Sequence, residues 1–281
     1  MKKFPRTEVG DISLPRMIIG TNWFVGYSHT SPAKDHYIKK EIYNVNNIAD
    51  VLEVYLAAGI NAIMAILEED SVLLNAIKEA EQRTGEKMIK ITTPIINVNN
   101  NEKARSQVEK LFDSSAEIGA DICMPHHSSV EQLVDKRLEK IKRIDDYTKM
   151  IRDRDMIPGL SAHMPEIIKY ADKNDNDIET YIQIYNAYGF LMQLEVEWVN
   201  KIIQKAKKPV MTIKPMAAGR ISPFVAFNFV WNTIRSQDMV TVGAMTPEEA
   251  REDIEISLAA LEKRNADIKG RSTPSQKTVM R

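Results

Sequence analysis

Only one cysteine, Cys123, occurs in the 281 residues, so an internal disulfide framework is excluded and a reducing compartment is favoured. No apolar run approaches the roughly 18 residues that a membrane-spanning helix needs. The first five residues lack the apolar core of a signal peptide. Charge of one sign is not in excess, since 38 Lys and Arg face 39 Asp and Glu. We therefore expect a cytoplasmic protein that acts on a small molecule, alone or as a homo-oligomer, and not on nucleic acid or a membrane.

Apolar runs of strand length alternate with helix-compatible segments along the whole chain. Eight such runs cover residues 12–20, 61–66, 88–93, 121–124, 156–161, 181–186, 210–214 and 240–243. The segments that follow them have helical spacing at 48–58, 72–84, 104–117, 136–154, 165–171, 196–206, 223–233 and 247–261. Eight strand–helix pairs predict a single (β/α)8 TIM barrel over residues 1–264, with a polar tail over 265–281.

Residues that follow the barrel strands are the candidates for function, because such barrels carry their chemistry at the C-terminal ends of the strands. A long polar loop is expected after the first strand, at about 22–46. It contains His29 and His36, which we expect at its surface.

Five short motifs lie at the ends of predicted strands. They are Ile19-Gly-Thr-Asn22, Asp121-Ile-Cys-Met-Pro-His126, Gly159-Leu-Ser-Ala-His163, Gln183-Ile-Tyr-Asn186 and Ile213-Lys-Pro-Met-Ala-Ala-Gly219. In order and spacing they resemble the aldo/keto reductase superfamily over nearly the full chain. The resemblance implies an N-terminal hairpin, formed by residues 3–6 and 12–20, that plugs the bottom of the barrel. It also implies reduction of carbonyls by a nicotinamide cofactor, with a Tyr proton donor, an Asp–Lys pair and a His.

Most of that catalytic set is absent. The Asp position falls at Met64, the Lys position at Thr93, and no Tyr follows in the loop after the second strand, so His126 alone remains. Without the Tyr, the developing alkoxide lacks its usual acid.

The resemblance would place a nicotinamide cofactor on Thr21, Ser161, Gln183 and Gly243. However, Glu249 and Asp253 stand where the family commonly has a basic residue and an Asn for the 2′-phosphate and adenine. A carboxylate repels a phosphate and disfavours NADP, although Arg220 and Arg251 lie nearby and could compensate.

Histidines gather on the predicted rim and offer different chemistry. His126 and His127 follow the fourth strand, and His163 follows the fifth. With Glu68 after the second strand, they could transfer protons, or His126 and His163 could bind a divalent metal. The structural alternatives are that residues 125–129 begin a helix capped by Ser128 or Ser129, and that Glu68 only favours a helix N-terminus.

Lys214, at the end of the seventh strand, is the third candidate catalytic residue. It could anchor an anionic substrate or, if desolvated, form a Schiff base; the alternative is a buried lysine paired with an acid. Further candidate contacts to substrate are Asn22, Trp23, Glu68, His127, Gln183, Asn186 and Arg220.

Three functions follow from these residues. The first is an isomerase-like or lyase-like enzyme that acts on a small polar carbonyl or sugar-type substrate through histidine acid–base chemistry, with or without a metal. The second is a divergent NAD(P)H-dependent oxidoreductase that uses His126 as proton donor. The third is a barrel that binds a small molecule without catalysis.

Overall fold

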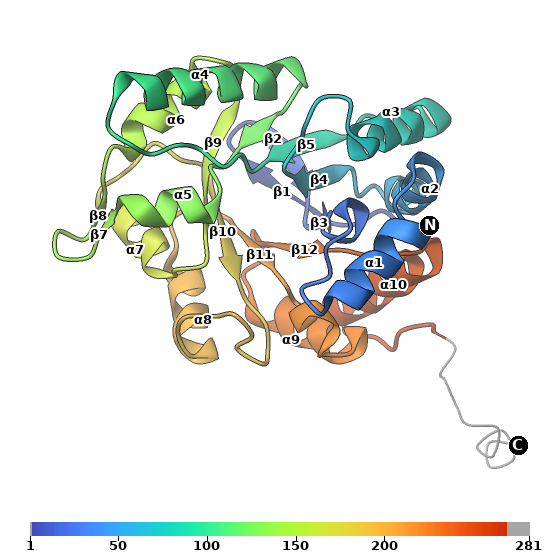
Figure 1. Cartoon of the computed structure of the whole chain (residues 1–281). Coiled ribbons are helices and arrows are strands. Elements are labelled where there is room, and N and C mark those ends of the chain that lie inside the picture. The colour runs from blue at the N-terminus through green and yellow to red at the C-terminus, as the bar shows by residue number, and fades with distance from the viewer. Residues whose placement is uncertain (1, 269–281) are drawn as a thin grey trace, which may run out of the picture.

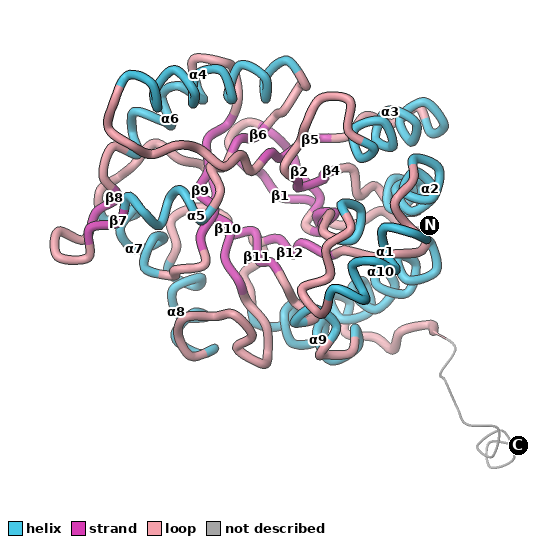
Figure 2. The backbone as a smooth tube through the Cα atoms, in the orientation of Figure 1, coloured by secondary structure: helices cyan, strands magenta, loops and turns pink. Residues whose placement is uncertain are grey.

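Eight parallel strands close into a barrel in the computed structural model, which describes residues 2–268 (Figures 1 and 2). The order around the barrel is β3-β4-β5-β6-β9-β10-β11-β12, and β12 pairs with β3 to close it. The predicted TIM barrel is confirmed. Its strands are β3 (Met17–Gly20), β4 (Ala62–Ala65), β5 (Ile89–Thr92), β6 (Ile122–Cys123), β9 (Ile157–Ala162), β10 (Thr180–Ile184), β11 (Val210–Ile213) and β12 (Met239–Val242). Residues 269–281, most of the predicted tail, lie outside the described part.

Helices surround the barrel and begin at readable caps. Asn101 and Thr246, for example, accept hydrogen bonds from the backbone N–H groups of Ala104 and Glu249. The helices after the strands are α2 (Val45–Ala57), α3 (Val72–Thr84), α4 (Glu102–Glu117), α6 (Ile144–Arg152), α7 (Glu166–Lys173), α8 (Val196–Lys205), α9 (Pro223–Thr233) and α10 (Pro247–Glu262). Within residues 2–268, none of the helices has the length and apolar character to cross a membrane.

The core has two parts. A cluster inside the barrel includes Ile18, Ile91, Ile182 and Met211, while a larger cluster lies between the strands and the helices. The hairpin of β1 (Arg6–Val9) and β2 (Ile12–Pro15) packs Val9 and Leu14, among others, into the inner cluster. The predicted hairpin is therefore present, although its first strand begins at Arg6 and not at Lys3.

Two predicted segments were wrong in detail. The expected loop at 22–46 contains η1 (Trp23–Val25) and helix α1 (Pro32–Glu41), which starts at the Ser31 cap with Pro32 in its first turn. The helix expected at 136–154 begins only at Ile144. A small hairpin of β7 (Val134–Asp135) and β8 (Lys140–Ile141) precedes it, because Glu139 and Arg143 have left-handed backbones with φ of 48° and 57°.

Candidate functional site

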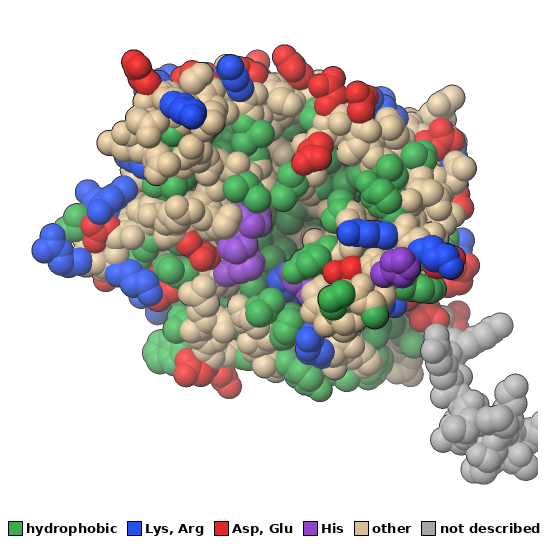
Figure 3. Space-filling view, in the orientation of Figure 1, with side chains coloured by type: hydrophobic (Ala, Val, Ile, Leu, Met, Phe, Trp, Pro, Cys, Tyr) green, Lys and Arg blue, Asp and Glu red, His purple; other side chains and the backbone are tan. Residues whose placement is uncertain are grey.

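Three histidines pack against one another at the mouth of the barrel. His126 and His127 follow β6, and His163 follows the neighbouring strand β9. The ring centroids are 4.1 Å apart for His126 and His127, and 3.6 Å apart for the stacked pair His127 and His163. Figure 3 shows histidine side chains gathered beside the hollow in the middle of this face. The structure thus brings together the three rim histidines found in the sequence.

His126 has a defined orientation. It caps the short helix α5 (His127–Val130), and its Nδ1 accepts a hydrogen bond from the Ser128 backbone N–H at 3.3 Å, with Ser128 Oγ at 2.8 Å. The expected cap at Ser128 or Ser129 was therefore two or three residues too late. Because Nδ1 accepts from that N–H, a neutral His126 ring carries its proton on Nε2. The Nε2–H of His126 can donate a hydrogen bond to a substrate oxygen.

Glu131, in η2 (Glu131–Leu133), was missed by the sequence reasoning. Its Oε1 accepts hydrogen bonds from the backbone N–H groups of His163 at 2.7 Å and Met164 at 3.0 Å. The same oxygen lies 3.9 Å from His127 Nδ1. Glu131 therefore joins the loop after β6 to the end of β9. Its spacing of four residues from His127 in a helical turn was the available signal.

The rings of His126 and His163 are held neutral at pH 7. Burial lowers the pKa of each to about 4, with smaller contributions from the neighbouring His127 and from the charge of Lys214. Neutral imidazole can accept a proton or donate an N–H hydrogen bond, but it is not a strong acid.

Lys214 faces the mouth because its backbone departs from the strand. In β11, Met211 and Ile213 pack into the barrel interior, so an extended residue 214 would point outward to the helices. Lys214 has φ of 61°, a left-handed conformation that ends this alternation. Its Nζ lies 3.0 Å from His29 Nε2. Burial lowers the pKa of the Lys214 ammonium to about 8.

His29 was expected at the loop surface, and this was wrong. Its Nε2 lies 2.8 Å from Asn22 Nδ2 and also contacts Lys214. Both neighbours are donors, so Nε2 accepts and the ring proton is on Nδ1. Burial, followed by the charge of Lys214, lowers the pKa of His29 to about 4. His36 is exposed, as expected.

Arg220 adds a second positive charge near this opening. Its guanidinium lies 4.2 Å from the Phe190 ring centroid, and Nη1 donates to the Ala217 carbonyl at 3.1 Å. Its charge also contributes to the lowered pKa of His29. Within the described residues, no carboxylate forms an ion pair with Arg220 or Lys214. The opening is therefore suited to an anionic group.

Two other candidates lie apart from the histidines. Glu68 is exposed, and within residues 2–268 it forms no ion pair with a histidine. Asn186 is fully buried, and its side-chain amide binds the backbone of Tyr188 and Phe190. These bonds hold the loop after β10, and substrate binding by Asn186 or Glu68 stays a prediction.

In the described part of the chain, no group of three or more His, Cys, Asp and Glu side chains is arranged to hold a metal ion. The suggested metal pair, His126 and His163, therefore gains no support.

The residues suggested for a nicotinamide lie at the ends of four strands. Ser161 and Gln183 are buried, and the fully buried Gln183 Oε1 has no hydrogen-bond partner within the described residues. Thr21 Oγ1 donates to the Met64 carbonyl. Trp23 fills the space at Gly243, where an added Cβ would lie 2.9 Å from the indole Cδ1.

The residues at the positions expected to meet the 2′-phosphate of the cofactor do not fit NADP. Glu249 accepts a hydrogen bond from the Met245 N–H at the start of α10, and Asp253 is 3 % exposed. Burial, and then the charge of Glu249, raises the pKa of Asp253. Carboxyl groups at these positions offer no cation to a 2′-phosphate.

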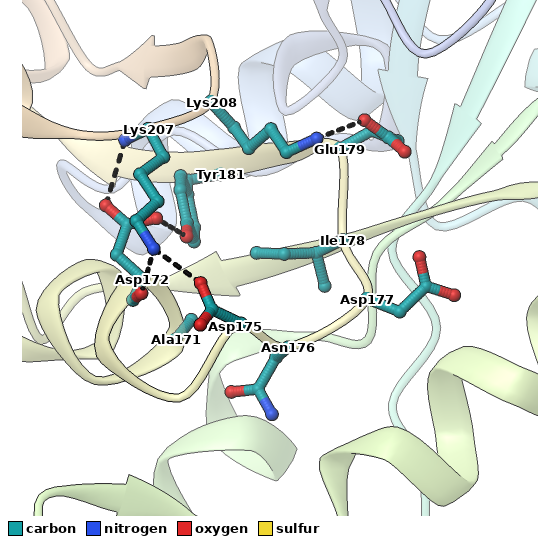
Figure 4. Close-up of a pocket in the computed structure, with 10 residues that line it drawn as sticks. All are labelled: Ala171, Asp172, Asp175, Asn176, Asp177, Ile178, Glu179, Tyr181, Lys207 and Lys208. Atoms are coloured by element: carbon teal, nitrogen blue, oxygen red, sulfur yellow. Dashed lines mark hydrogen bonds and ion pairs between the residues drawn. The ribbon is translucent and has the colours of Figure 1, made fainter.

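A separate pocket of about 230 Å³ lies between α7, the start of β10 and the residues before β11 (Figure 4). Its polar groups bind one another: Lys207 Nζ donates to the Asp172 backbone carbonyl at 2.7 Å, and the Tyr181 hydroxyl donates to the Asp172 carboxylate at 2.6 Å. These residues flank the N-terminal ends of the strands, where barrel residues serve stability.

Comparison with known proteins gives matches by structure alone. No family model matches the chain, and no curated protein does. A Pseudomonas aeruginosa protein described as a candidate aldo-keto reductase superposes with a TM-score of 0.64 at 14% identity, covering 92% of this chain and 97% of that chain. An aldo-keto reductase from Klebsiella pneumoniae in complex with NADPH gives a TM-score of 0.59 at 14% identity, covering 100% and 94%.

This chain is structurally similar to aldo-keto reductases. A ribulose-1,5-bisphosphate carboxylase/oxygenase from Pyrococcus horikoshii also matches, with a TM-score of 0.51 at 13% identity over 84% of this chain and 61% of that one. At such identities the similarity establishes the barrel fold and not the reaction.

Proposed function

We propose that this aldo-keto-reductase-like barrel is an enzyme that transfers protons on a small anionic carbonyl compound, such as a 2-oxo acid or a sugar phosphate. The observation that carries the proposal is the pair of neutral rings, His126 and His163, within a histidine cluster beside two cations that lack carboxylate partners. Residues in a cleft whose pKa values are shifted by burial and neighbouring charges are candidates for a functional site.

Each group has a role that its geometry supports. Arg220 and Lys214 bind the anionic part of the substrate. His126 Nε2–H donates to the carbonyl oxygen, which stabilises the negative charge that develops there. His163 forms no side-chain hydrogen bond within the described residues, so its neutral ring accepts the proton from the adjacent carbon. Glu131 positions His163 through its backbone.

Proton exchange in D2O tests this proposal without knowledge of the product. The wild-type protein is incubated with a panel of 2-oxo acids and phosphorylated aldoses and ketoses, and loss of the α-proton signal is followed by 1H NMR. We expect exchange with at least one compound, and a loss of roughly 100-fold or more in His163→Gln. His36→Gln, at an exposed histidine, is the matched control. Binding of a compound without exchange would instead indicate a non-catalytic binding barrel.

The similarity to solved aldo-keto reductases favours a second candidate, a nicotinamide-dependent oxidoreductase. Glu249 and Asp253, however, oppose the phosphorylated cofactor. Titration with NADH and NADPH, followed by the intrinsic tryptophan fluorescence to which Trp23 contributes, distinguishes the candidates. Saturable quenching by NADH, together with oxidation of NADH in the presence of a carbonyl compound, would favour the oxidoreductase.

A further inference from the structure

We propose that Lys214 is a covalent catalyst whose Nζ forms an imine with the carbonyl carbon of the substrate. This inference rests on the proposed function in one respect, namely that the substrate is a carbonyl compound. In the proposed function Lys214 attracts the substrate electrostatically, whereas here it forms a covalent bond with the substrate.

The backbone around Lys214 is held in an unfavourable conformation. Lys214 has φ of 61° and precedes Pro215, and Ala217 and Ala218 also have positive φ, at 49° and 54°. A non-glycine residue in this region costs on the order of 1 kcal/mol, and such strain concentrates at functional sites. Here it turns the amine from the outer face of β11 to the mouth.

The surroundings of the amine favour its neutral form. Lys214 is partly buried, the neutral His29 ring lies at hydrogen-bond distance from its Nζ, and no carboxylate among residues 2–268 pairs with it. Burial holds the pKa of Lys214 at about 8 against 10.5 for an ordinary lysine. At pH 8 about half of the Lys214 amines are therefore unprotonated, against roughly 1 in 300 for an ordinary lysine. The unprotonated amine is the nucleophile.

The step is balanced by groups at the mouth. The Nζ lone pair attacks the carbonyl carbon, an N–C bond forms, and the carbonyl π electrons move to oxygen. His163 accepts a proton from the nitrogen and returns it to that oxygen. The hydroxyl then leaves as water with one proton from solvent, which gives a positively charged iminium. The iminium withdraws electrons from the adjacent carbon, whose proton His163 can accept.

Reductive trapping tests the inference. The intact protein is mixed with pyruvate, or with glycolaldehyde phosphate, and then with sodium borohydride, and adducts are located by peptide mass spectrometry. We expect a borohydride-dependent adduct on the Lys214 peptide with at least one probe. Lys214→Arg, which keeps the charge, should lose the adduct and lower α-proton exchange by at least about 100-fold. Lys208→Arg, at an amine paired with Glu179, is the control and should retain both.

The outcomes separate the two proposals. Exchange without an adduct at Lys214, or full exchange by Lys214→Arg, overturns covalent catalysis and leaves proton transfer standing. An adduct without exchange supports the reactive amine and contradicts the proposed function. If neither is seen with either probe, the inference is overturned as well. Circular dichroism of each variant confirms that it is folded.

Discussion

Replacing His29 with aspartate should remove the unusual reactivity of Lys214. His29 Nε2 lies 3.0 Å from Lys214 Nζ and carries no charge at neutral pH. The drop in the pKa of Lys214 from 10.5 to about 8 corresponds to about 3 kcal/mol against the ammonium form. A carboxylate about 4 Å away at an effective dielectric constant of ~20 attracts that ammonium by about 4 kcal/mol. The attraction therefore exceeds the effect of burial.

We expect the pKa of Lys214 to return to the ordinary lysine range in His29→Asp. The unprotonated fraction at pH 7.5 then falls roughly 200-fold, and trapping with borohydride slows by the same factor. His29→Asn is the matched control, because its neutral amide adds no charge. Both side chains tolerate the left-handed backbone at this position, where φ is 55°.

The assay is a 1H–13C NMR titration of the lysine ε-CH2 groups, with the Lys214 signal assigned by its absence in Lys214→Arg. The reasoning is refuted if Lys214 titrates near 10.5 in the wild-type protein. It is also refuted if the aspartate and asparagine variants give the same titration, because Nζ would then not face position 29.

Three further predictions concern stability. The pKa values of His126 and His163 are about 4 in the folded protein and 6.5 in the unfolded chain. At pH values between 4 and 6.5 the unfolded state therefore binds more protons than the folded state. Stability to urea should then fall by on the order of 1 kcal/mol per ring as pH drops from 6.5 toward 4, and a constant value would contradict this. Gly159→Ala places a Cβ 2.8 Å from Met124 Cε and 2.9 Å from the Thr180 carbonyl oxygen. We expect the variant to lose about 1–3 kcal/mol of folding stability, measured by thermal unfolding. An unchanged Tm would mean that the interior relaxes around the added methyl group. Because the pKa of Asp253 is raised on folding, ionisation of Asp253 opposes folding above pH 3.8. Asp253→Asn should therefore raise the free energy of unfolding in urea by roughly 1 kcal/mol at pH 7 and leave it unchanged at pH 3. An equal gain at both pH values would refute this cause.

The barrel strands could be predicted because strands buried on both faces appear as continuous apolar runs. Residues 210–213 and 239–242 are such runs, and their bounds in the structure differ by one residue from the predicted ones. Helix α1 was not predicted because its sequence is polar on nearly all sides and only Ile38 is buried. Its capping signal, Ser31 followed by Pro32, was present in the sequence and was passed over.

The candidate site was predictable where strand order decides it. His126 and His163 follow β6 and β9, which pair directly, so consecutive barrel strands bring them together. The contact between His29 and Lys214 joins residues 185 positions apart, across loops whose paths depend on single backbone conformations. No periodicity in the sequence indicates that Lys214 leaves the alternation of its strand.

The uncharged side chains of Met64 and Thr93 and the protonation of Lys214 are linked. Met64 and Thr93 stand at the positions where the aldo/keto reductases that the sequence resembles have an acid and a lysine; both are buried, and Met64 belongs to the cluster inside the barrel. A carboxylate facing Lys214 would hold it protonated and make it a source of charge alone. Without such a carboxylate, burial lowers the pKa of Lys214 unopposed, and a fraction of the lysine is unprotonated and able to react. A barrel mouth with uncharged side chains at these two positions and a partly unprotonated lysine thus favours amine and imidazole chemistry.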